Sequence, residues 1–232
     1  MTARVIDVES TGVDPAKDAI IEIASVDLVR GEDGTIGIGN PMATYVDPER
    51  PIPPQSSAIH HILGEDVNGA PKLDAALEPF RGAQAYIAHN AEFEKGFLGS
   101  HLGCDPIWLC TFKCALLLFP DFVSHSNQAL RYELGLASPF GQDRHSIVPH
   151  RADSDVVVTA AILVEMLKTT PWAQLVAWSQ EPALFTRFNF GKHRGERFDA
   201  HPDYCEWVLR QADMDAGVRF SAEYWLKRRE AA

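Results

Sequence analysis

Asp7 and Glu9 stand two positions apart in the segment VIDVESTG, an apolar strand pattern that runs into a glycine turn. Successive side chains of a strand point to opposite faces, so we expect both carboxylates on one face at the C-terminal end of the strand. Two like charges so close together are unfavourable unless a cation or a water-filled cleft holds them. The pair favours a metal site. The plainer alternative is that both carboxylates face open solvent at the strand end.

A further acidic pair and a histidine lie in HRADSDVVVTAAIL, where a polar loop enters an apolar helix pattern. Asp153 and Asp155 fall near the helix start, where acidic residues are common as caps, so capping is the alternative to chemistry. His150 follows Pro149 in the loop and by itself is typical of a surface histidine. Its offset of five residues from Asp155 gains meaning beside the first motif.

The segment AYIAHNAEFEKGFL carries a buried strand pattern, then His89 and Asn90, then a helix pattern with Glu92 and Glu94. Two residues apart on a helix correspond to about 200° around its axis, so the two glutamates cannot both point at one site. At most one of them is catalytic, and the other belongs to the solvent side of the helix.

Together these motifs resemble the DEDDh 3′–5′ exonuclease superfamily, whose marks are an Asp-x-Glu strand, a His-Asn-x-x-Phe-Asp segment and a His-x4-Asp segment. Glu94 stands where the family has an aspartate. The likeness runs from about residue 3 to residue 212, through IIEIASVDLV, YIAHNAEF, SNQAL and TAAIL into the tail segment FNFGKHRGERF. The residues that match the family motifs exactly in type are Asp7, Glu9, His150 and Asp155.

The resemblance implies a site for two divalent cations, Mg²⁺ or Mn²⁺. Hard cations prefer oxygen ligands, which suits a cluster of carboxylates without cysteine. Glu92 is assigned to solvent, and His150 is the implied general base, because histidine exchanges its proton near neutral pH. Its proline-flanked loop indicates that His150 swings into place when a strand end binds. The implied metal ligands are Asp7, Glu9, Asp155 and, through bound water, Glu94.

The resemblance also implies residues that contact the substrate. In relatives the turn after the first motif packs against the terminal nucleotide. The backbone of a glycine turn can approach a sugar closely, and Val13 can press an apolar side chain against a base. The alternative for this turn is a plain end of the strand. The full set of substrate candidates is Thr11, Gly12, Val13, His60, His89, Asn90, Lys192 and Arg194.

The elements that position these residues follow from the apolar patterns. RVIDVE, AIIEIASVDLV and MATYV predict an antiparallel meander. Short helices at 57–61 and 72–80, a strand in QAYIAHN and a helix in AEFEKGFLGSHL come next. A strand near 107–109, helices near 110–119 and 127–134, and the apolar helix DSDVVVTAAILVEMLKTT complete the order. This alternation indicates an α/β fold, and the resemblance specifies a ribonuclease H-like mixed β-sheet flanked by helices over residues 1–180.

Residues 181–232 change character and predict a small basic and aromatic C-terminal module. The module holds a basic and aromatic set able to meet phosphates and bases: Lys192, Arg194, Arg197, Phe188, Phe190 and Trp207. The alternative is that the aromatic residues form the core of the module and the basic residues its solvated face.

Composition and net charge exclude some classes of function. The net charge is −11, which argues against a non-specific nucleic-acid coat but permits a nuclease whose carboxylates gather cations. Residues 1–180 hold 12 Lys and Arg against 23 Asp and Glu, whereas the tail holds 9 of each, so the tail repels nucleic acid less. We expect no membrane span, no signal segment, a cytoplasmic protein and four reduced cysteines.

The leading hypothesis is a metal-dependent 3′–5′ exodeoxyribonuclease that removes nucleotides from single-stranded and duplex DNA 3′ ends, in DNA repair. A polymerase proofreading subunit and an RNA 3′-end trimming enzyme share the catalytic motifs, and the tail favours the DNA enzyme over both. A nucleic-acid binding module that has lost catalysis is a further alternative, suggested by Glu94 in place of the family aspartate.

Overall fold

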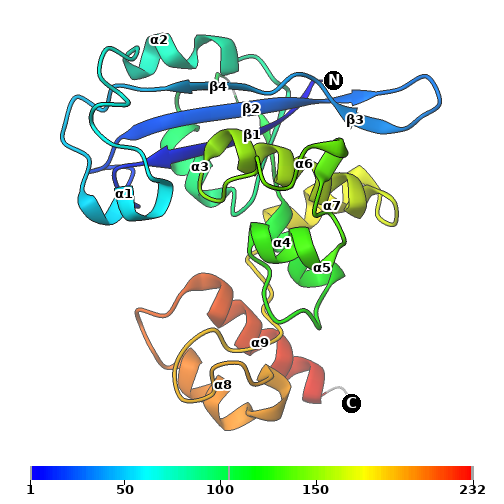
Figure 1. The fold of residues 1–232 in the computed structure, drawn as a ribbon. Helices are drawn as coiled ribbons and strands as arrows, with labels where there is room; N and C mark the ends of the chain where they lie inside the picture. The colour runs from blue at the N-terminus through cyan, green and yellow to red at the C-terminus, as the bar shows by residue number, and fades with distance from the viewer. Residues whose placement is uncertain (1, 104, 231–232) are drawn as a thin grey trace.

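The computed structural model describes residues 2–103 and 105–230, so the thiol of Cys104 lies outside it. Figure 1 shows a sheet with flanking helices and, joined to it by an extended connection, a smaller helical part at the C-terminus. No described helix is by itself long and apolar enough to cross a membrane; α6 (Ala152–Leu167) and α7 (Trp172–Gln180) pass that test only as a pair, bent by 115°.

Six strands form one mixed sheet in the order β3-β2-β1-β5-β6, with β4 also paired to β2. The first four strands are antiparallel neighbours, whereas β5 lies parallel to β1 and to β6. The predicted meander is present, with the segment MATYV as β4, and a further short strand, β3, lies inside the glycine-rich stretch before it. The strands are β1 (Ala3–Ser10), β2 (Ile20–Arg30), β3 (Ile36–Ile38), β4 (Met42–Tyr45), β5 (Ala85–Ala88) and β6 (Ile107–Cys110).

Helices follow the strands in the predicted alternation. Three further helices, α7, α8 and α9, fall where we predict no element. The helices are α1 (Pro54–His60), α2 (Leu73–Leu77), α3 (Glu92–Leu98), α4 (Thr111–Leu118), α5 (Asn127–Glu133), α6 (Ala152–Leu167), α7 (Trp172–Gln180), α8 (Pro202–Leu209) and α9 (Ala216–Glu230). The apolar helix predicted in DSDVVVTAAILVEMLKTT is α6, and it is buried over most of its length.

The alternation of β1 separates two apolar cores. Val5 belongs to the core beneath α6, whereas Ile6 and Val8 belong to the core beneath α2 and α3. Because side chains two apart share a face, Asp7 and Glu9 lie on the α6 side of the sheet. The sheet therefore delivers its two carboxylates toward the helix that carries the later acidic motif.

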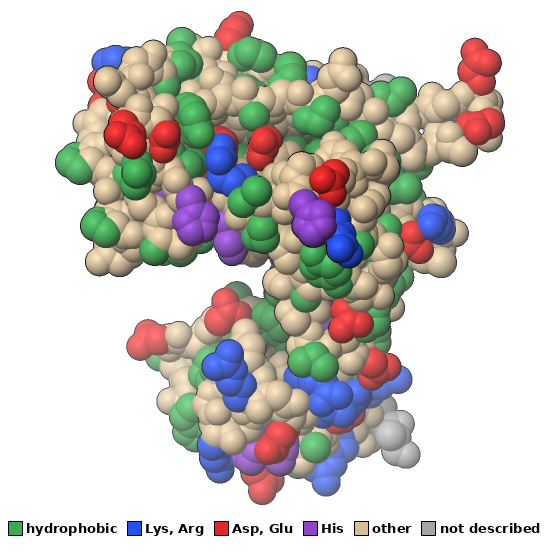
Figure 2. Space-filling view, viewed as in Figure 1, with side chains coloured by type: hydrophobic (Ala, Val, Ile, Leu, Met, Phe, Trp, Pro, Cys, Tyr) green, Lys and Arg blue, Asp and Glu red, His purple; other side chains and the backbone are tan. Residues whose placement is uncertain are grey.

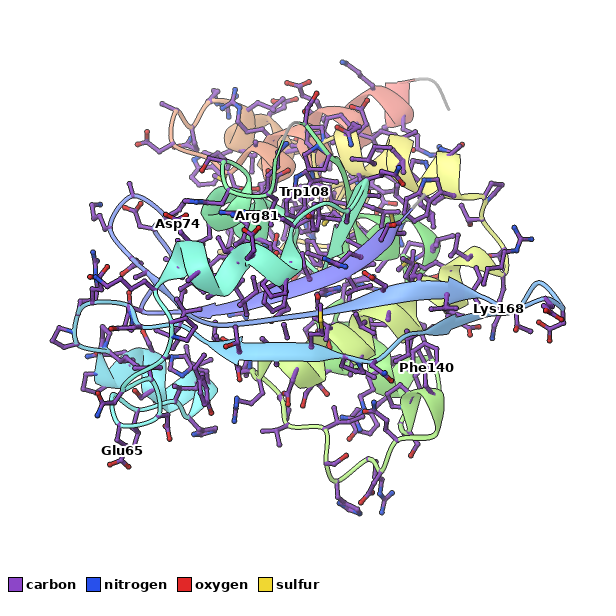
Figure 3. All side chains as sticks on the ribbon, turned by 90° about the horizontal axis from the view of Figure 1, so that it is seen from above. Glu65, Asp74, Arg81, Trp108, Phe140 and Lys168 are labelled. Carbon is purple, nitrogen blue, oxygen red and sulfur yellow. The ribbon has the colours of Figure 1, made fainter. Side chains whose placement is uncertain are left out.

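The opposite face is closed by α2 and the turn after α3. Arg81 lies after α2, where it pairs with Asp74 and Glu78 and donates from Nε to the carbonyl oxygen of His101 at 2.9 Å. Figure 3 shows Asp74 and Arg81 together above the strands. These contacts tie α2 to the end of α3, the helix that carries Glu94.

The C-terminal part has its own apolar core. Phe188 and Phe198 stack with their ring centroids 3.8 Å apart, and Cys205, Val208 and Val218 are buried around them. The aromatic residues at this position thus form a core, as the alternative interpretation has it, although Trp207 remains 39% exposed. We keep residues 181–232 as a proposed module.

Candidate active site

A cavity of about 640 Å³ opens at the C-terminal end of β1. Residues from β1, the turn after it, α1, the start of α3, α5 and the loop before α6 line it. It brings together most of the candidates that the sequence suggests. Those that line it are Asp7, Glu9, Gly12, Val13, His60, His89, Asn90, His150 and Asp155.

Asp7, Glu9 and Asp155 each offer a carboxylate oxygen, and these oxygens lie within 4.8 Å of one another. The arrangement follows from the fold, because alternation in β1 turns the first two toward α6 and Asp155 lies in the first turn of that helix. Residues from distant parts of the sequence thus form one acidic cluster.

The electrostatics of this cluster suit a cation. Burial raises the pKa of Asp7 well above its ordinary value, and the charges of Glu94 and Asp155 raise it further. Burial, followed by Asp155 and Glu22, raises the pKa of Glu9 to about 8, although Arg151 lowers it. Since a divalent cation would relieve both the burial cost and the repulsion, an oxygen donor set of this kind fits a hard metal ion. The described residues therefore contain a cluster that could bind a divalent metal.

Glu94 lies on the buried side of α3 and is 3% exposed. Its Oε2 atom is buried without a hydrogen-bond partner among the described residues, and burial followed by the charge of Glu9 raises its pKa to about 8. Glu94 is not one of the three carboxylates whose oxygens lie within 4.8 Å of one another, and it is not among the residues that line the cavity. Glu92 is exposed and pairs with Lys113 at 2.9 Å, so its assignment to solvent is confirmed.

Two neighbours orient Asp155. Gln128 on α5 donates from Nε2 to Oδ1 at 2.9 Å, and the backbone N–H of His150 donates to Oδ2 at 2.9 Å. Burial nevertheless raises the pKa of Asp155, and these two hydrogen bonds oppose that shift. The sequence patterns do not single out Gln128, although it stands in SNQAL, two residues after Ser126, whose hydroxyl caps α5.

His150 is exposed at the edge of the cavity and has a left-handed backbone conformation with φ of 58°. Residues other than glycine adopt that conformation infrequently, and it often marks a functional position. His150 directly follows Pro149 in the loop and lies five residues before Asp155, whose carboxylate accepts the backbone N–H of His150.

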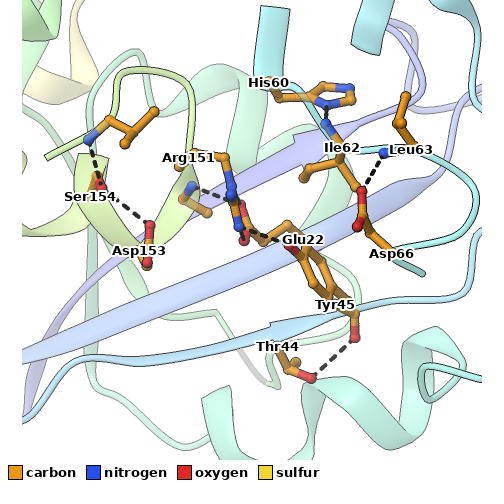
Figure 4. A network of polar contacts seen from close by, with 12 residues as sticks. Glu22, Thr44, Tyr45, His60, Ile62, Leu63, Asp66, Arg151, Asp153 and Ser154 are labelled. Atoms are coloured by element: carbon orange, nitrogen blue, oxygen red, sulfur yellow. Dashed lines mark hydrogen bonds and ion pairs between the residues drawn. The ribbon is translucent and has the colours of Figure 1, made fainter. Parts of the chain in front are cut away.

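A buried ion pair anchors this loop to the sheet. Glu22 on β2 is 3% exposed and accepts hydrogen bonds from Nη2 and Nε of Arg151 at 2.6 and 3.1 Å and from the backbone N–H of Ala152 at 3.0 Å. Tyr45 accepts a further bond from Arg151 (Figure 4). The sequence reasoning misses this pair; the available signal was a glutamate inside the apolar strand IIEIAS.

The turn after β1 places its three candidates differently. Thr11 is 3% exposed, and its hydroxyl contacts Asp18 and the backbone N–H of Ala19, so its side chain faces the turn rather than the cavity. A Cβ atom on Gly12 would lie 2.5 Å from a carboxylate oxygen of Asp18, so only glycine fits without a shift. Val13 is 82% exposed on the rim of the cavity.

His60 and His89 differ in whether a ring nitrogen is left without a hydrogen-bond partner among the described residues. His60 is buried and accepts at Nδ1 from the backbone N–H of Ile62 at 3.0 Å, so the proton of the neutral ring sits on Nε2, which has no described partner. His89 uses both nitrogens, on Thr111 and on the carbonyl of His125, and burial lowers its pKa to about 4. His60 therefore has a free donor, whereas His89 is committed to the structure.

Lys192 and Arg194 lie outside this cavity. Arg194 lines a second hollow of about 660 Å³ between residues 112–126 and the C-terminal part. That hollow shares Phe112 and Ser126 with the first cavity, so the two are adjacent. Figure 2 shows the recess between the two parts of the molecule. The Lys192 amine instead stands 5.4 Å from the ring centroid of Tyr204, in a separate hollow.

Comparison with known proteins identifies the family. Residues 5–163 match the family model described as exonuclease. The chain is 34% identical to Exodeoxyribonuclease 10 of Escherichia coli (strain K12), over 97% of this chain and 98% of that protein. It is 33% identical to a DNA polymerase III of the PolC type from Clostridium perfringens (strain 13 / Type A), over 68% of this chain and 11% of that protein.

A similar solved structure is exonuclease X in complex with 5′ overhanging duplex DNA, with 34% identity and a TM-score of 0.62, covering 76% of this chain and 99% of that chain. The predicted ribonuclease H-like fold is thereby confirmed. The acidic cluster, the fold that assembles it and these likenesses agree: the chain belongs to the exonuclease family and is a 3′–5′ exonuclease, a phosphodiester hydrolase.

Proposed function

We propose that this enzyme is a 3′–5′ exodeoxyribonuclease that removes nucleotides from the 3′ ends of single-stranded and duplex DNA, in DNA repair. One observation carries the choice of DNA: the alignment with Exodeoxyribonuclease 10 extends over 97% of this chain, tail included. The likeness to the PolC-type polymerase covers 68% of this chain and only 11% of the polymerase, which gives weaker support to a proofreading role.

The proposed cofactor is a pair of Mg²⁺ or Mn²⁺ ions, held by Asp7, Glu9 and Asp155, with Glu94 acting through bound water. The mutual approach of the first three carboxylates supports this, as does the unpartnered oxygen of Glu94. When bound, two such ions polarise the scissile phosphate and help to ionise the attacking water. Gln128 keeps Asp155 oriented toward the cluster.

His150 is the proposed general base, which takes the proton from the attacking water. Its exposure at the cavity edge leaves the imidazole free to turn toward a bound strand end, while its backbone N–H stays bonded to Asp155. The Glu22–Arg151 ion pair limits how far this loop moves, since it fixes the next residue to β2. The loop can therefore reorient one side chain without losing the carboxylate beside it.

The substrate end is proposed to lie between the turn after β1 and α1. Val13 offers an exposed apolar side chain for the terminal base, and the Nε2–H of His60 offers a buried donor to a polar group of the nucleotide. Asn90 presents its side chain from the cavity wall. Arg194, in the adjacent hollow, is placed to meet a phosphate of the strand farther from its end.

The function is tested by incubating 3′-end-labelled DNA and RNA oligonucleotides with the enzyme in Mg²⁺, in Mn²⁺ and in EDTA. Single-stranded, blunt and mispaired duplex substrates are compared, and Glu92→Gln serves as a control that leaves the cluster intact. We expect release of the 3′ label from DNA in both metals and none in EDTA. Faster release from RNA than from DNA would replace the DNA assignment with RNA 3′-end trimming.

We also propose the cytoplasm as the compartment. Cys110, Cys114 and Cys205, the cysteines that the structure describes, are free and buried, which is typical of a reducing environment.

A further inference from the structure

A second group of possible metal ligands lies in the C-terminal part, away from the carboxylate cluster. One donor atom from each of His193, Glu196 and His201 lies within 4.8 Å of the other two. The Nδ1 atom of His193 is 2.9 Å from Oε2 of Glu196, and Nε2 of His201 contacts the same oxygen. Two imidazoles and a carboxylate thus converge on one point.

The local fold brings these side chains together from two elements. His193 and Glu196 stand in a turn that Gly191 and Gly195 make possible, since both glycines have positive φ, 67° and 85°. The backbone N–H of Glu196 donates to the carbonyl of His193 at 2.9 Å and closes this turn. His201 is the residue before α8, and its carbonyl accepts the backbone N–H of Cys205 at 3.0 Å.

The rings are held by packing as well as by the backbone. The imidazoles of His193 and His201 stack with centroids 3.8 Å apart, and Tyr204 meets His193 edge-on at 4.9 Å. Phe188, a central residue of the module core, lies 6.3 Å from both imidazole centroids. The donor atoms are therefore positioned by a packed aromatic layer.

We propose that His193, Glu196 and His201 form a binding site for a transition-metal ion of the Zn²⁺ type. Two imidazoles and one carboxylate are a donor set that zinc uses in proteins, and imidazole favours zinc, copper or nickel over magnesium and calcium. The carboxylate cluster, made of oxygen donors alone, has the opposite preference. The enzyme would then carry two metal sites of different chemistry.

The surroundings leave room for a further ligand. His193 and His201 line a hollow of about 590 Å³ together with Lys192, Asp203 and Tyr204. The side chains of His193 and His201 are 20% and 27% exposed, so water or a carboxylate can complete the coordination from this side. The exposed hollow also gives the ion a path of entry.

Binding of the ion would connect the 191–196 turn to the start of α8. Because a preformed site is absent from an unfolded chain, the binding free energy adds to the stability of the folded module. The alternative is a hydrogen-bonded triad that needs no ion, in which the ionised Glu196 accepts from both histidines. The hydrogen bond from His193, which lowers the pKa of Glu196, belongs to this ion-free arrangement, because a ring nitrogen that binds the ion cannot also donate to Glu196.

The test uses the full chain carrying Asp7→Asn in excess Mg²⁺, so that zinc does not occupy the carboxylate cluster. Zn²⁺ is titrated calorimetrically, and Co²⁺ is added in a parallel experiment to record the visible absorption of the bound ion. The variants are His193→Ala, His201→Ala and Glu196→Gln. His145→Ala, an exposed histidine of another loop, is the control.

We expect the parent to bind one zinc ion per chain and to melt at a higher temperature in its presence. Both histidine variants lose that ion and the shift in melting temperature, Glu196→Gln binds more weakly, and His145→Ala behaves as the parent. Circular dichroism without metal verifies that each variant is folded. Should His201→Ala bind zinc as the parent does, or should the parent bind none, the site is refuted. Neither result depends on whether the enzyme hydrolyses DNA.

Discussion

Glu22 and Arg151, 129 residues apart in sequence, are joined by two hydrogen bonds of 2.6 and 3.1 Å. The pair links the second strand of the sheet to the residue directly after His150 and four residues before Asp155. The segment from His150 to Asp155 is thus attached to the same sheet that carries Asp7 and Glu9. The ion pair is a positioning device for the proposed base and the proposed metal ligand.

The first prediction concerns this pair. Glu22→Gln removes the charge that Arg151 faces, and breaking a buried pair typically costs about 3–5 kcal/mol, a value to be reduced here because Arg151 is partly exposed. We expect a lower melting temperature and a kcat reduced by about 10- to 100-fold, with a smaller change in KM. Thermal melts and steady-state kinetics on labelled DNA measure both. Glu165→Gln, which alters an ion pair at the far end of α6, is the matched control; equal effects in the two variants would remove the positioning role.

The second prediction concerns pH in the absence of metal. The pKa values of Glu9 and Glu94 rise from 4.5 to about 8, so the folded chain binds these protons more tightly than the unfolded chain does. The resulting stability is complete below about pH 4.5, the pKa in the unfolded chain, and is lost as pH rises toward 8.

In EDTA, therefore, the free energy of unfolding should fall between about pH 5 and pH 8, and Mg²⁺ should restore more of it at the higher pH. Denaturant unfolding at several pH values, with and without Mg²⁺, measures this. Glu9→Gln should flatten the decline seen in EDTA. A parent protein whose stability in EDTA rises across this window, with the variant parallel to it, would show that the cluster does not hold these protons.

The third prediction separates the two glutamates of α3. Glu94→Asp keeps the carboxylate and shortens the side chain, so activity should be retained or change modestly. Glu94→Gln should be severely impaired, because a neutral amide cannot hold a metal-bound water in the same way. Glu92→Gln, on the exposed side of the same helix, is the control. Parent-like hydrolysis by Glu94→Gln together with loss of activity in Glu92→Gln would reverse the assignment.

The fourth prediction concerns Val13. Its side chain is 82% exposed and lines the cavity, so it has little to contribute to folding. Val13→Gly should leave the melting temperature nearly unchanged and weaken binding of a DNA 3′ end by about 1 kcal/mol, which corresponds to about fivefold. Binding is measured by fluorescence anisotropy in Ca²⁺ to prevent hydrolysis. Val29→Ala, an exposed valine on β2, is the control; unchanged affinity in Val13→Gly would leave the turn as a simple strand end.

The carboxylate cluster could be predicted from the sequence because the direction of each side chain follows from the periodicity of its own strand or helix. Alternation in β1 puts Asp7 and Glu9 on one face, and helical geometry separates Glu92 from Glu94. The strand predicted in MATYV is present as β4, whereas β3 could not be predicted, since its three residues form a strand through pairing with β2 rather than through an apolar pattern of their own.

Contacts between distant segments were likewise hidden. Gln128 on α5 donates a hydrogen bond to Asp155 on α6, and Arg151 donates to Glu22, 129 residues away in the sequence. Thr11 matches the family segment, yet its hydroxyl is occupied by Asp18 within the turn. A motif gives a residue's position along the chain. The direction of its side chain depends on residues that are neighbours in the folded protein, and a single sequence does not reveal which residues these are.

The most direct test of the mechanism is His150→Ala, measured by single-turnover release of a 3′ nucleotide in Mg²⁺ and by DNA affinity in Ca²⁺. The residue is exposed and holds Asp155 through its backbone, so the substitution leaves the cluster in place. We expect a hydrolysis rate lower by about 10²- to 10⁴-fold at nearly unchanged affinity. Hydrolysis at the parent rate would contradict this expectation.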